Sequence, residues 1–203
     1  HDVSSLEMVA CGGSAVPRSL MTAYDELGIR IVQAWGMTET SPLAAVALPR
    51  NTDTPERSLY LRGTQGRVVA GVQARIVDDS GAEQPWDGLS VGEIQIRGPW
   101  ITQSYYEHDS PAVSPDGWLC TGDVGTISAD AFITLTDRAK DVIKSGGEWI
   151  SSVELENELA AHPAVRTATV IGVPDDKWQE RPLAVVVLAA DCTATAAELT
   201  EFL

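Results

Sequence analysis

A short polar stretch in the first quarter of the chain has residue types suited to binding a nucleotide. It reads Gln33-Ala34-Trp35-Gly36-Met37-Thr38-Glu39-Thr40. A glycine lets the backbone approach a flat ligand closely, a threonine hydroxyl can donate to a phosphate oxygen, and a carboxylate is a ligand that Mg²⁺ prefers. Taken alone, the stretch is equally compatible with a strand-to-loop turn carrying solvated polar residues.

A second stretch places an aspartate directly after a glycine. It reads Gly117-Trp118-Leu119-Cys120-Thr121-Gly122-Asp123. Acidic residues in other nucleotide sites accept hydrogen bonds from ribose hydroxyls, and Asp123 is placed to do the same. Without other signals, an aspartate-containing β-turn is the simpler interpretation.

The third stretch concentrates positive charge in an acidic chain. Arg138, Lys140 and Lys144 are three of the 14 basic residues, and they lie within seven positions of one another. Such a concentration suits a polyphosphate or a phosphate-bearing thiol, although a solvated loop of mixed charge has the same composition. Ser145-Gly146-Gly147 follows directly and adds backbone freedom.

Composition narrows the classes of partner. The net charge of −15 at pH 7 disfavours nucleic acid and anionic lipid, because both need a basic surface. The apolar runs are too short to span a bilayer, so we expect no transmembrane segment. The three cysteines form no CxxC pair, which is typical of a reducing compartment and predicts a cytoplasmic protein.

The stretches lie among elements of an α/β protein. We expect a strand over residues 6–11, a helix whose first turn holds Pro17, and a second strand over 29–34. Residues 51–137 instead alternate in short runs between turn residues, which predicts a small barrel or curled sheet.

The last third has the signals of an α+β unit. Capping-box spacing at Ser151 and Glu154 predicts a helix over 152–162, and Thr195 with Glu198 announces a final helix. Residues 165–173 and 183–188 have the composition of buried strands. The final helix has an apolar face and no C-cap before the chain ends, so we expect a fragment of a longer protein.

These stretches together resemble the adenylate-forming superfamily of AMP-binding enzymes. The resemblance rests on four motifs in the family's order: Gly12-Gly13-Ser14-Ala15-Val16-Pro17, Trp35-Gly36-Met37-Thr38-Glu39, Thr121-Gly122-Asp123 and Asp137-Arg138-Ala139-Lys140-Asp141. It covers essentially the whole chain. It implies the end of a large AMP-binding domain over 1–137, divided into an α/β segment (1–50) and a barrel-like subdomain (51–137). The start of a small mobile domain would follow over 138–203.

The resemblance also implies a role for individual residues. It assigns nucleotide binding to Gly12, Gly13, Ser14, Gln33, Ala34, Trp35, Gly36, Met37, Thr38, Asp123, Leu135 and Arg138. It assigns catalysis to Thr38, Glu39, Arg138 and Lys144, with Glu39 as the Mg²⁺ ligand. It places the hinge between the domains at Lys140, within 137–140, and a CoA-facing loop at Ser145, Gly146, Gly147, Glu148 and Trp149.

The implied activity is that of an acyl-CoA synthetase. Such an enzyme uses ATP and Mg²⁺ to activate a carboxylic acid as an acyl-adenylate, and then transfers the acyl group to CoA. The sequence around Glu148-Trp149 is most similar to that of medium- and long-chain fatty acyl-CoA synthetases, so a fatty acid is the expected substrate. A homodimer is considered for the full-length enzyme.

Two family features have no counterpart in these residues. They are the phosphate loop that ends in Lys-Gly and the C-terminal lysine of the adenylation step, so we expect the isolated chain to form no acyl-adenylate. Two alternatives stay open: an adenylation domain that loads a carrier-protein thiol, and a nucleotide-binding module without catalysis. Cys120 departs from the basic or polar residue that is commoner in the family, and no histidine near it in sequence would make it a nucleophile.

Overall fold

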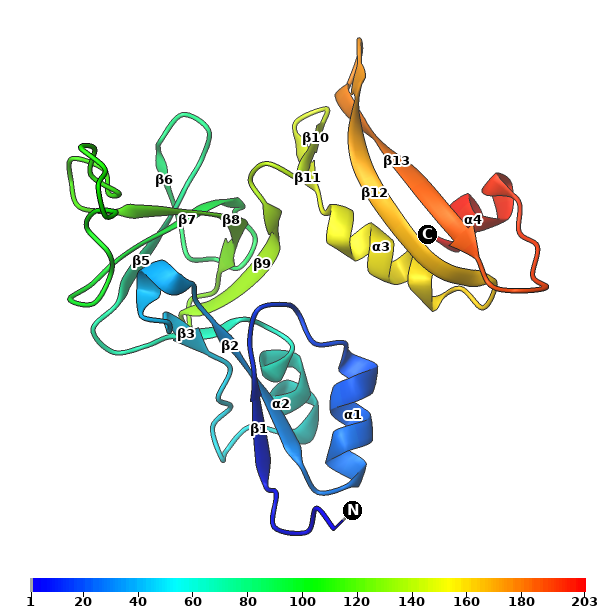
Figure 1. The fold of residues 1–203 in the computed structure, drawn as a ribbon, viewed down its shortest axis with the longest axis horizontal. Helices are drawn as coiled ribbons and strands as arrows, with labels where there is room; N and C mark the ends of the chain where they lie inside the picture. Colours follow the sequence, from blue (N-terminus) through cyan, green and yellow to red (C-terminus); the bar gives the residue numbers. More distant parts are fainter. Residues whose placement is uncertain (1) are drawn as a thin grey trace. The chain divides into compact units, whose positions relative to one another are not determined.

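A computed structural model describes residues 2–203 of the chain. The residues form two compact units. The large unit runs up to Thr121 and includes Gly125–Leu135, and the small unit comprises Gly122–Val124 and Thr136–Leu203. The predicted mixture of helices and strands is confirmed in both units (Figure 1).

The large unit is built mainly from short strands. Its elements, with the two strands that pass into the small unit, are β1 (Met8–Cys11), α1 (Arg18–Glu26), β2 (Arg30–Trp35), the 3₁₀ turn η1 (Thr38–Thr40), β3 (Ala45–Val46), α2 (Pro55–Arg62), β4 (Gly66–Val68), β5 (Gln73–Val77), β6 (Glu83–Gln84), β7 (Gly92–Arg97), β8 (Leu119–Ile127) and β9 (Phe132–Arg138).

These strands join in one sheet with the order β1-β2-β3-β4-β9-β8-β7-β5-β6. β1 and β2 are parallel, whereas β2 and β3, β3 and β4, β4 and β9, and β5 with both β6 and β7 are antiparallel. The order has two ends, so the strands of residues 51–137 form a curled continuation of the first sheet segment and do not close into a barrel.

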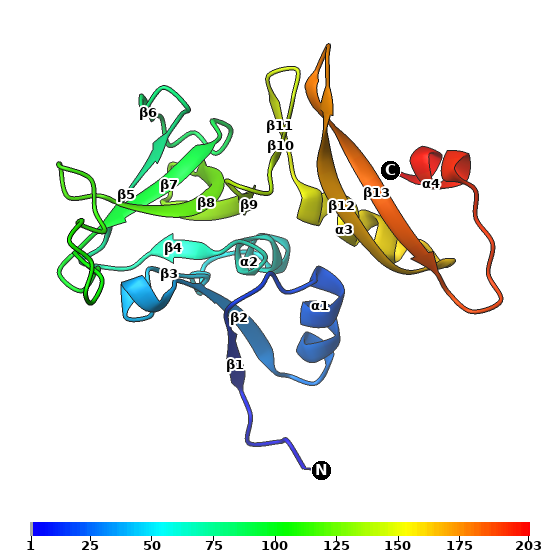
Figure 2. The same cartoon turned by 45° about the horizontal axis from the view of Figure 1, so that its top comes forward.

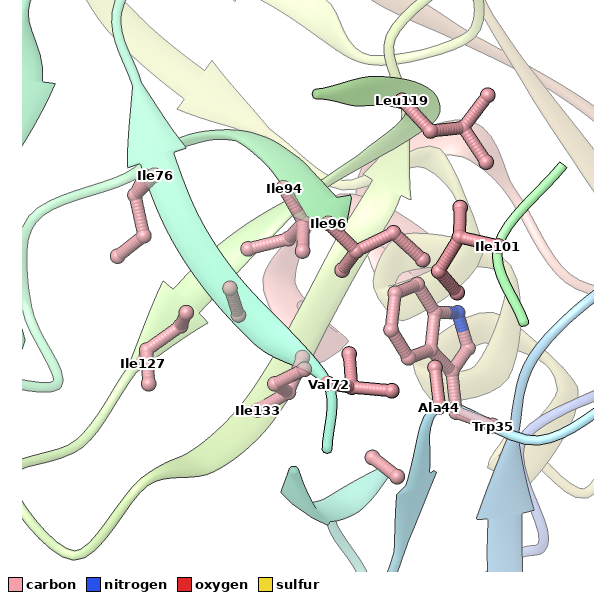
Figure 3. Close-up of a cluster of buried hydrophobic side chains, with 12 residues drawn as sticks. Trp35, Ala44, Val72, Ile76, Ile94, Ile96, Ile101, Leu119, Ile127 and Ile133 are labelled. Atoms are coloured by element: carbon pink, nitrogen blue, oxygen red, sulfur yellow. The ribbon is translucent and has the colours of Figure 1, made fainter. Parts of the chain in front are cut away.

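Alternating isoleucines hold the large sheet together. Ile76, Ile94, Ile96, Ile127 and Ile133 are all fully buried in one cluster (Figure 3). Side chains alternate between the two faces of a strand, and β-branched residues pack well on a pleated surface. The short alternating runs predicted within residues 51–137 therefore produce the core that positions the strand ends.

The small unit is a second sheet with two helices. Its elements are β10 (Ile143–Ser145), β11 (Glu148–Ile150), α3 (Ser152–Ala161), β12 (Val165–Asp175), β13 (Gln179–Leu188) and α4 (Ala196–Phe202). The strand order is β11-β10-β13-β12, and every neighbouring pair is antiparallel. α3 lies along the β12–β13 hairpin in both ribbon views (Figures 1 and 2).

The expectation that β12 and β13 are buried strands is wrong for one of their faces. Ile171, Leu183, Val185 and Val187 are 41–58% exposed, and we call these four residues the open face. Both helices contribute to a single core, where Leu159 of α3 and Leu199 of α4 pack with strand residues such as Val170. Because alternate strand residues point to opposite faces, covering one face leaves the other exposed.

The two predicted helix starts in this unit are confirmed by their caps. The Ser151 hydroxyl accepts a hydrogen bond from the Glu154 backbone N–H at 3.0 Å. In α4, the Glu198 N–H donates to the Thr195 hydroxyl, and the Glu198 carboxylate accepts from the Thr195 N–H at 2.7 Å. Both caps satisfy donors that a helix N-terminus otherwise leaves unpaired.

The α4 cap makes the helix sensitive to acid. The hydrogen bond from the Thr195 backbone, and then the one from its hydroxyl, hold the pKa of Glu198 below its ordinary value of 4.5. A carboxyl group whose pKa is lowered by folding stabilises the folded state above its unfolded pKa, and that contribution is lost as the pH falls through the folded pKa.

We therefore expect amide exchange in α4 to accelerate, beyond its intrinsic pH dependence, as the pH falls from about 5 to about 3. Glu198→Gln should remove this dependence, and Glu201→Gln, near the other end of the helix, is the matched control. Hydrogen exchange followed by mass spectrometry measures both. Equal acid sensitivity in the wild type and in Glu198→Gln would contradict the assignment.

None of the helices in residues 2–203 is long and apolar enough to cross a membrane.

Candidate functional site

Two turns that are predicted to bind a nucleotide follow the carboxyl ends of neighbouring strands in the large sheet. β1 and β2 are parallel, with Cys11 opposite Gln33, so the turn 12–14 and the loop 36–39 both follow carboxyl ends of strands. The turn and strand are in close contact, since a Cβ atom at Gly12 would lie 3.0 Å from the Ala34 carbonyl oxygen. Ligands of open α/β sheets bind outside the carboxyl ends of the strands.

Gly36 allows the second turn to fold back on itself. A Cβ atom here would lie 1.9 Å from the Pro42 carbonyl oxygen and 2.6 Å from the Thr40 hydroxyl. Thr40 is fully buried, and its hydroxyl accepts from the Met37 N–H and donates to the Met37 carbonyl, each at 2.8 Å. This compact turn leaves Thr38 exposed at its surface, where its hydroxyl can meet a ligand.

Glu39 is the acidic residue of this turn, and its side chain is held by a distant tyrosine. The Tyr105 hydroxyl donates to Glu39 Oε1 at 2.8 Å. That hydrogen bond, followed by burial and the negative charge of Glu39, raises the pKa of Tyr105 above its ordinary value. The backbone carbonyl of Glu39 also accepts from the Thr102 N–H at 2.9 Å.

Two predicted nucleotide-binding residues have structural contacts of their own. Gln33 is buried, and its amide accepts from the Val16 N–H at 2.9 Å and donates to the Arg62 and Thr64 carbonyls at 3.0 and 3.2 Å. The indole of Trp35 lies in the large core (Figure 3). Both side chains thus shape the strand end, and their contact with a nucleotide stays a prediction.

In the small unit, the predicted ribose-binding residues lie together. Arg138 Nε is 2.9 Å from Asp123 Oδ1. The Asp123 side chain is 5% exposed, whereas that of Arg138 is 52% exposed. A carboxylate paired with a guanidinium is a strong acceptor for hydroxyl donors.

Asp137 connects this pair to the start of α3. Its Oδ2 accepts from both the backbone N–H and the hydroxyl of Ser152, at 2.8 and 2.6 Å, and its Oδ1 accepts from the Arg138 N–H at 2.7 Å. The Ser151 hydroxyl donates to the Thr136 carbonyl at 2.6 Å. The end of β9 is therefore joined to the α3 N-terminus by three hydrogen bonds.

The predicted CoA-facing loop is the tight hairpin between β10 and β11. Lys144 pairs with Trp149 across it, and Lys144 Nζ lies 4.4 Å from the centre of the tryptophan ring. Gly146 and Gly147 turn the chain with φ of +62° and +91°, which glycine adopts without a steric cost. Glu148, which pairs with Ser145, is exposed, as is Lys140 upstream, so the hinge and loop roles stay predictions.

Several contacts at these sites had no signal in the sequence. Tyr105 lies 66 residues from Glu39, and the Gln65 amide oxygen accepts from the Leu135 N–H at 2.6 Å across 70 positions. Leu135 is half-buried against the large core, so this bond fixes the residue predicted beside the ribose. These partners are far apart in sequence and come together only in the folded chain.

The chain belongs to the family of AMP-binding enzymes. The family model described as "AMP-binding enzyme" matches residues 1–106, and the model of the AMP-binding enzyme C-terminal domain matches residues 154–203. The resemblance drawn from the four motifs is thereby confirmed.

Named relatives include several CoA ligases. The chain is 47% identical over 204 residues to the 3-methylmercaptopropionyl-CoA ligase of Ruegeria lacuscaerulensis, covering 98% of this chain and 38% of that protein. It is 44% identical to the medium-chain-fatty-acid–CoA ligase of Ectopseudomonas oleovorans, with 98% and 37% covered. The chain thus spans less than two-fifths of the length of these relatives.

Solved structures show the same fold. The o-succinylbenzoate CoA synthetase of Bacillus subtilis, in complex with the acyl-adenylate intermediate OSB-AMP, superposes with a TM-score of 0.81 at 34% identity. The match covers 98% of this chain and 39% of the synthetase.

Proposed function

We propose that this chain is part of an ATP-dependent acyl-CoA synthetase that activates a fatty acid as its acyl-adenylate and then transfers the acyl group to CoA. The carrying observation is the convergence of turn 12–14 and loop 36–39 at the carboxyl edge of β1 and β2. Relatives named as CoA ligases, and a neighbour bound to an acyl-adenylate, support the assignment.

The two steps need different groups. In the first, the acid's carboxylate displaces pyrophosphate from the α-phosphorus of ATP, and in the second the CoA thiol displaces AMP from the acyl carbon. We assign the α-phosphate to the Thr38 hydroxyl, the ribose hydroxyls to Asp123, and stabilisation of negative charge to Arg138 and Lys144. Fixed donors and cations aimed at developing charge supply most of the acceleration in such reactions.

Glu39 is chemically suited to hold Mg²⁺. Within residues 2–203 no cluster of three or more His, Cys, Asp or Glu side chains could hold a metal ion, so Glu39 would act as a single carboxylate ligand. This fits Mg²⁺, which proteins commonly bind through one or two carboxylates together with substrate phosphates. When bound, Mg²⁺ would neutralise phosphate charge, and Glu39 would fix where it sits.

A stable acyl-adenylate analogue tests the proposal and its substrate class. We expect the chain to bind dodecanoyl sulfamoyl adenosine more tightly than AMP, because an acyl site would add buried apolar area. Asp123→Asn should weaken both ligands about 10-fold, since it removes hydrogen bonds to a charged acceptor. Titration calorimetry measures the affinities.

The control for this experiment is Asp109→Asn, which alters an exposed carboxylate near Tyr105 in sequence. It should leave both affinities unchanged. Equal binding of AMP by Asp123→Asn and the wild type would contradict the ribose assignment. Equal binding of AMP and the dodecanoyl analogue by the wild type would contradict the fatty acyl part alone.

A further inference from the structure

The loop after β7 is attached to the Glu39 turn at four points. Besides the bonds of Tyr105 and Thr102 to Glu39, the Ser41 hydroxyl donates to the Trp100 carbonyl at 3.2 Å. The Trp100 indole N–H in turn donates to the Leu43 carbonyl at 3.1 Å. In three of these hydrogen bonds the acceptor is a backbone carbonyl. Only the Tyr105 hydroxyl contacts a side chain that we assign to ligand binding, that of Glu39.

The hydrogen-bond donor to Glu39 is the uncharged hydroxyl of Tyr105, which does not neutralise the Glu39 carboxylate. In residues 2–203, no Arg, Lys or His side chain forms an ion pair with Glu39. Asp123 is different, because its carboxylate is paired with the Arg138 guanidinium. A phenol orients a carboxylate through Oε1 without cancelling its negative charge, which leaves the group attractive to a cation.

We propose that Tyr105 is a positioning residue that holds the Glu39 carboxylate ready for a divalent cation bound with ATP. The inference rests on the proposed function, since that function makes Glu39 the cation ligand. A free glutamate side chain samples many rotamers, and a ligand that must itself order this side chain binds less tightly because of the entropy lost. The Tyr105 bond orders Glu39 before the cation arrives.

The hydrogen bond from the Tyr105 hydroxyl to Glu39 is not needed to stabilise the loop. The tyrosine is 47% exposed, so its hydrogen bond to Glu39 lies near solvent. The backbone contacts of Thr102 and Trp100 already anchor the loop. The neighbouring Tyr106 is 88% exposed and supplies a matched control.

The test measures binding of Mn²⁺ and ATP to the 203-residue chain by water-proton relaxation, with Mn²⁺ replacing Mg²⁺ at an oxygen site. Tyr105→Phe should weaken Mn²⁺–ATP binding about 3- to 10-fold, the range for one lost hydrogen bond. Tyr106→Phe should leave it unchanged. Binding of ATP in EDTA, measured by calorimetry, and the thermal unfolding midpoint should not change in Tyr105→Phe.

Two outcomes overturn the positioning role while leaving the proposed function intact. In the first, Tyr105→Phe binds Mn²⁺–ATP with the affinity of the wild type, although Glu39→Gln loses this affinity. In the second, Tyr105→Phe loses ATP binding equally with and without the metal, which indicates that the loop is disturbed. If the wild-type affinity depends on neither Mn²⁺ nor Glu39, the metal role of Glu39 in the proposed function fails, and the role of Tyr105 fails with it.

Discussion

Replacing Leu159 with alanine is expected to lower the free energy of unfolding of the small unit by about 2–5 kcal/mol. Leu159 is 1% exposed, and it belongs to the buried cluster that also contains Ile143, Val165, Val170 and Leu199. Removing its side chain loses the transfer free energy of the buried atoms and leaves a cavity that the rigid hairpin cannot fill. Denaturant-dependent hydrogen exchange, read peptide by peptide, separates the small unit from the large one.

Leu183→Ala is the matched control for this substitution. Leu183 belongs to the same unit but is 47% exposed on the open face, so its truncation should cost less than about 1 kcal/mol. Comparable losses in the two variants would mean that the core is not organised around Leu159.

Gly36→Ala is expected to disturb the candidate nucleotide site directly. The added Cβ atom would meet the backbone of Pro42 at 1.9 Å, and backbone cannot rotate aside as a flexible side chain does. We expect a loss of about 2–3 kcal/mol in stability. Because the turn must open, Thr38 and Glu39 move with it, and the affinity for ATP should fall at least about 10-fold. Chemical denaturation and calorimetry measure the two effects.

Gly81→Ala separates this clash from a general sensitivity of glycines that have a positive φ. Gly81 is not among the predicted nucleotide-binding residues. It has a φ of +81°, and no atom lies within 4 Å of the position its Cβ would take. Only backbone strain should then arise, costing about 1–2 kcal/mol. If Gly81→Ala reduced ATP affinity as much as Gly36→Ala, the packed turn after β2 would not be the determining feature.

Local signals in the sequence were sufficient for most helices. The caps at Ser151 and Thr195 are formed as predicted, because an N-cap depends on residues only three positions apart. After α1, Gly28 has a φ of +76°, a conformation that favours glycine at the end of a helix. α2 was missed, although Thr54 caps it and Pro55 begins it, because the surrounding alternation favoured strands.

Long-range placement could not be predicted in the same way. The motifs predict which residues bind a nucleotide, but they do not show that Gln33 and Trp35 also stabilise the end of the sheet from within the protein interior. Nor could spacing show which face of the β12–β13 hairpin the helices cover, since β13 carries aliphatic residues on both of its faces. A hydrophobic residue type indicates that a side chain can be buried, but whether it is buried depends on the topology of the fold.

The open face has a consequence for how copies of this chain behave in solution. Four aliphatic side chains on adjacent strands would favour self-association, and at pH 7 the net charge of −15 opposes it by mutual repulsion. That protection has a finite range, about 8 Å at physiological ionic strength, and it vanishes near the isoelectric point of about 4.4. We therefore expect electrostatic repulsion to keep copies of the chain apart near pH 7, and acid or concentrated salt to make them aggregate.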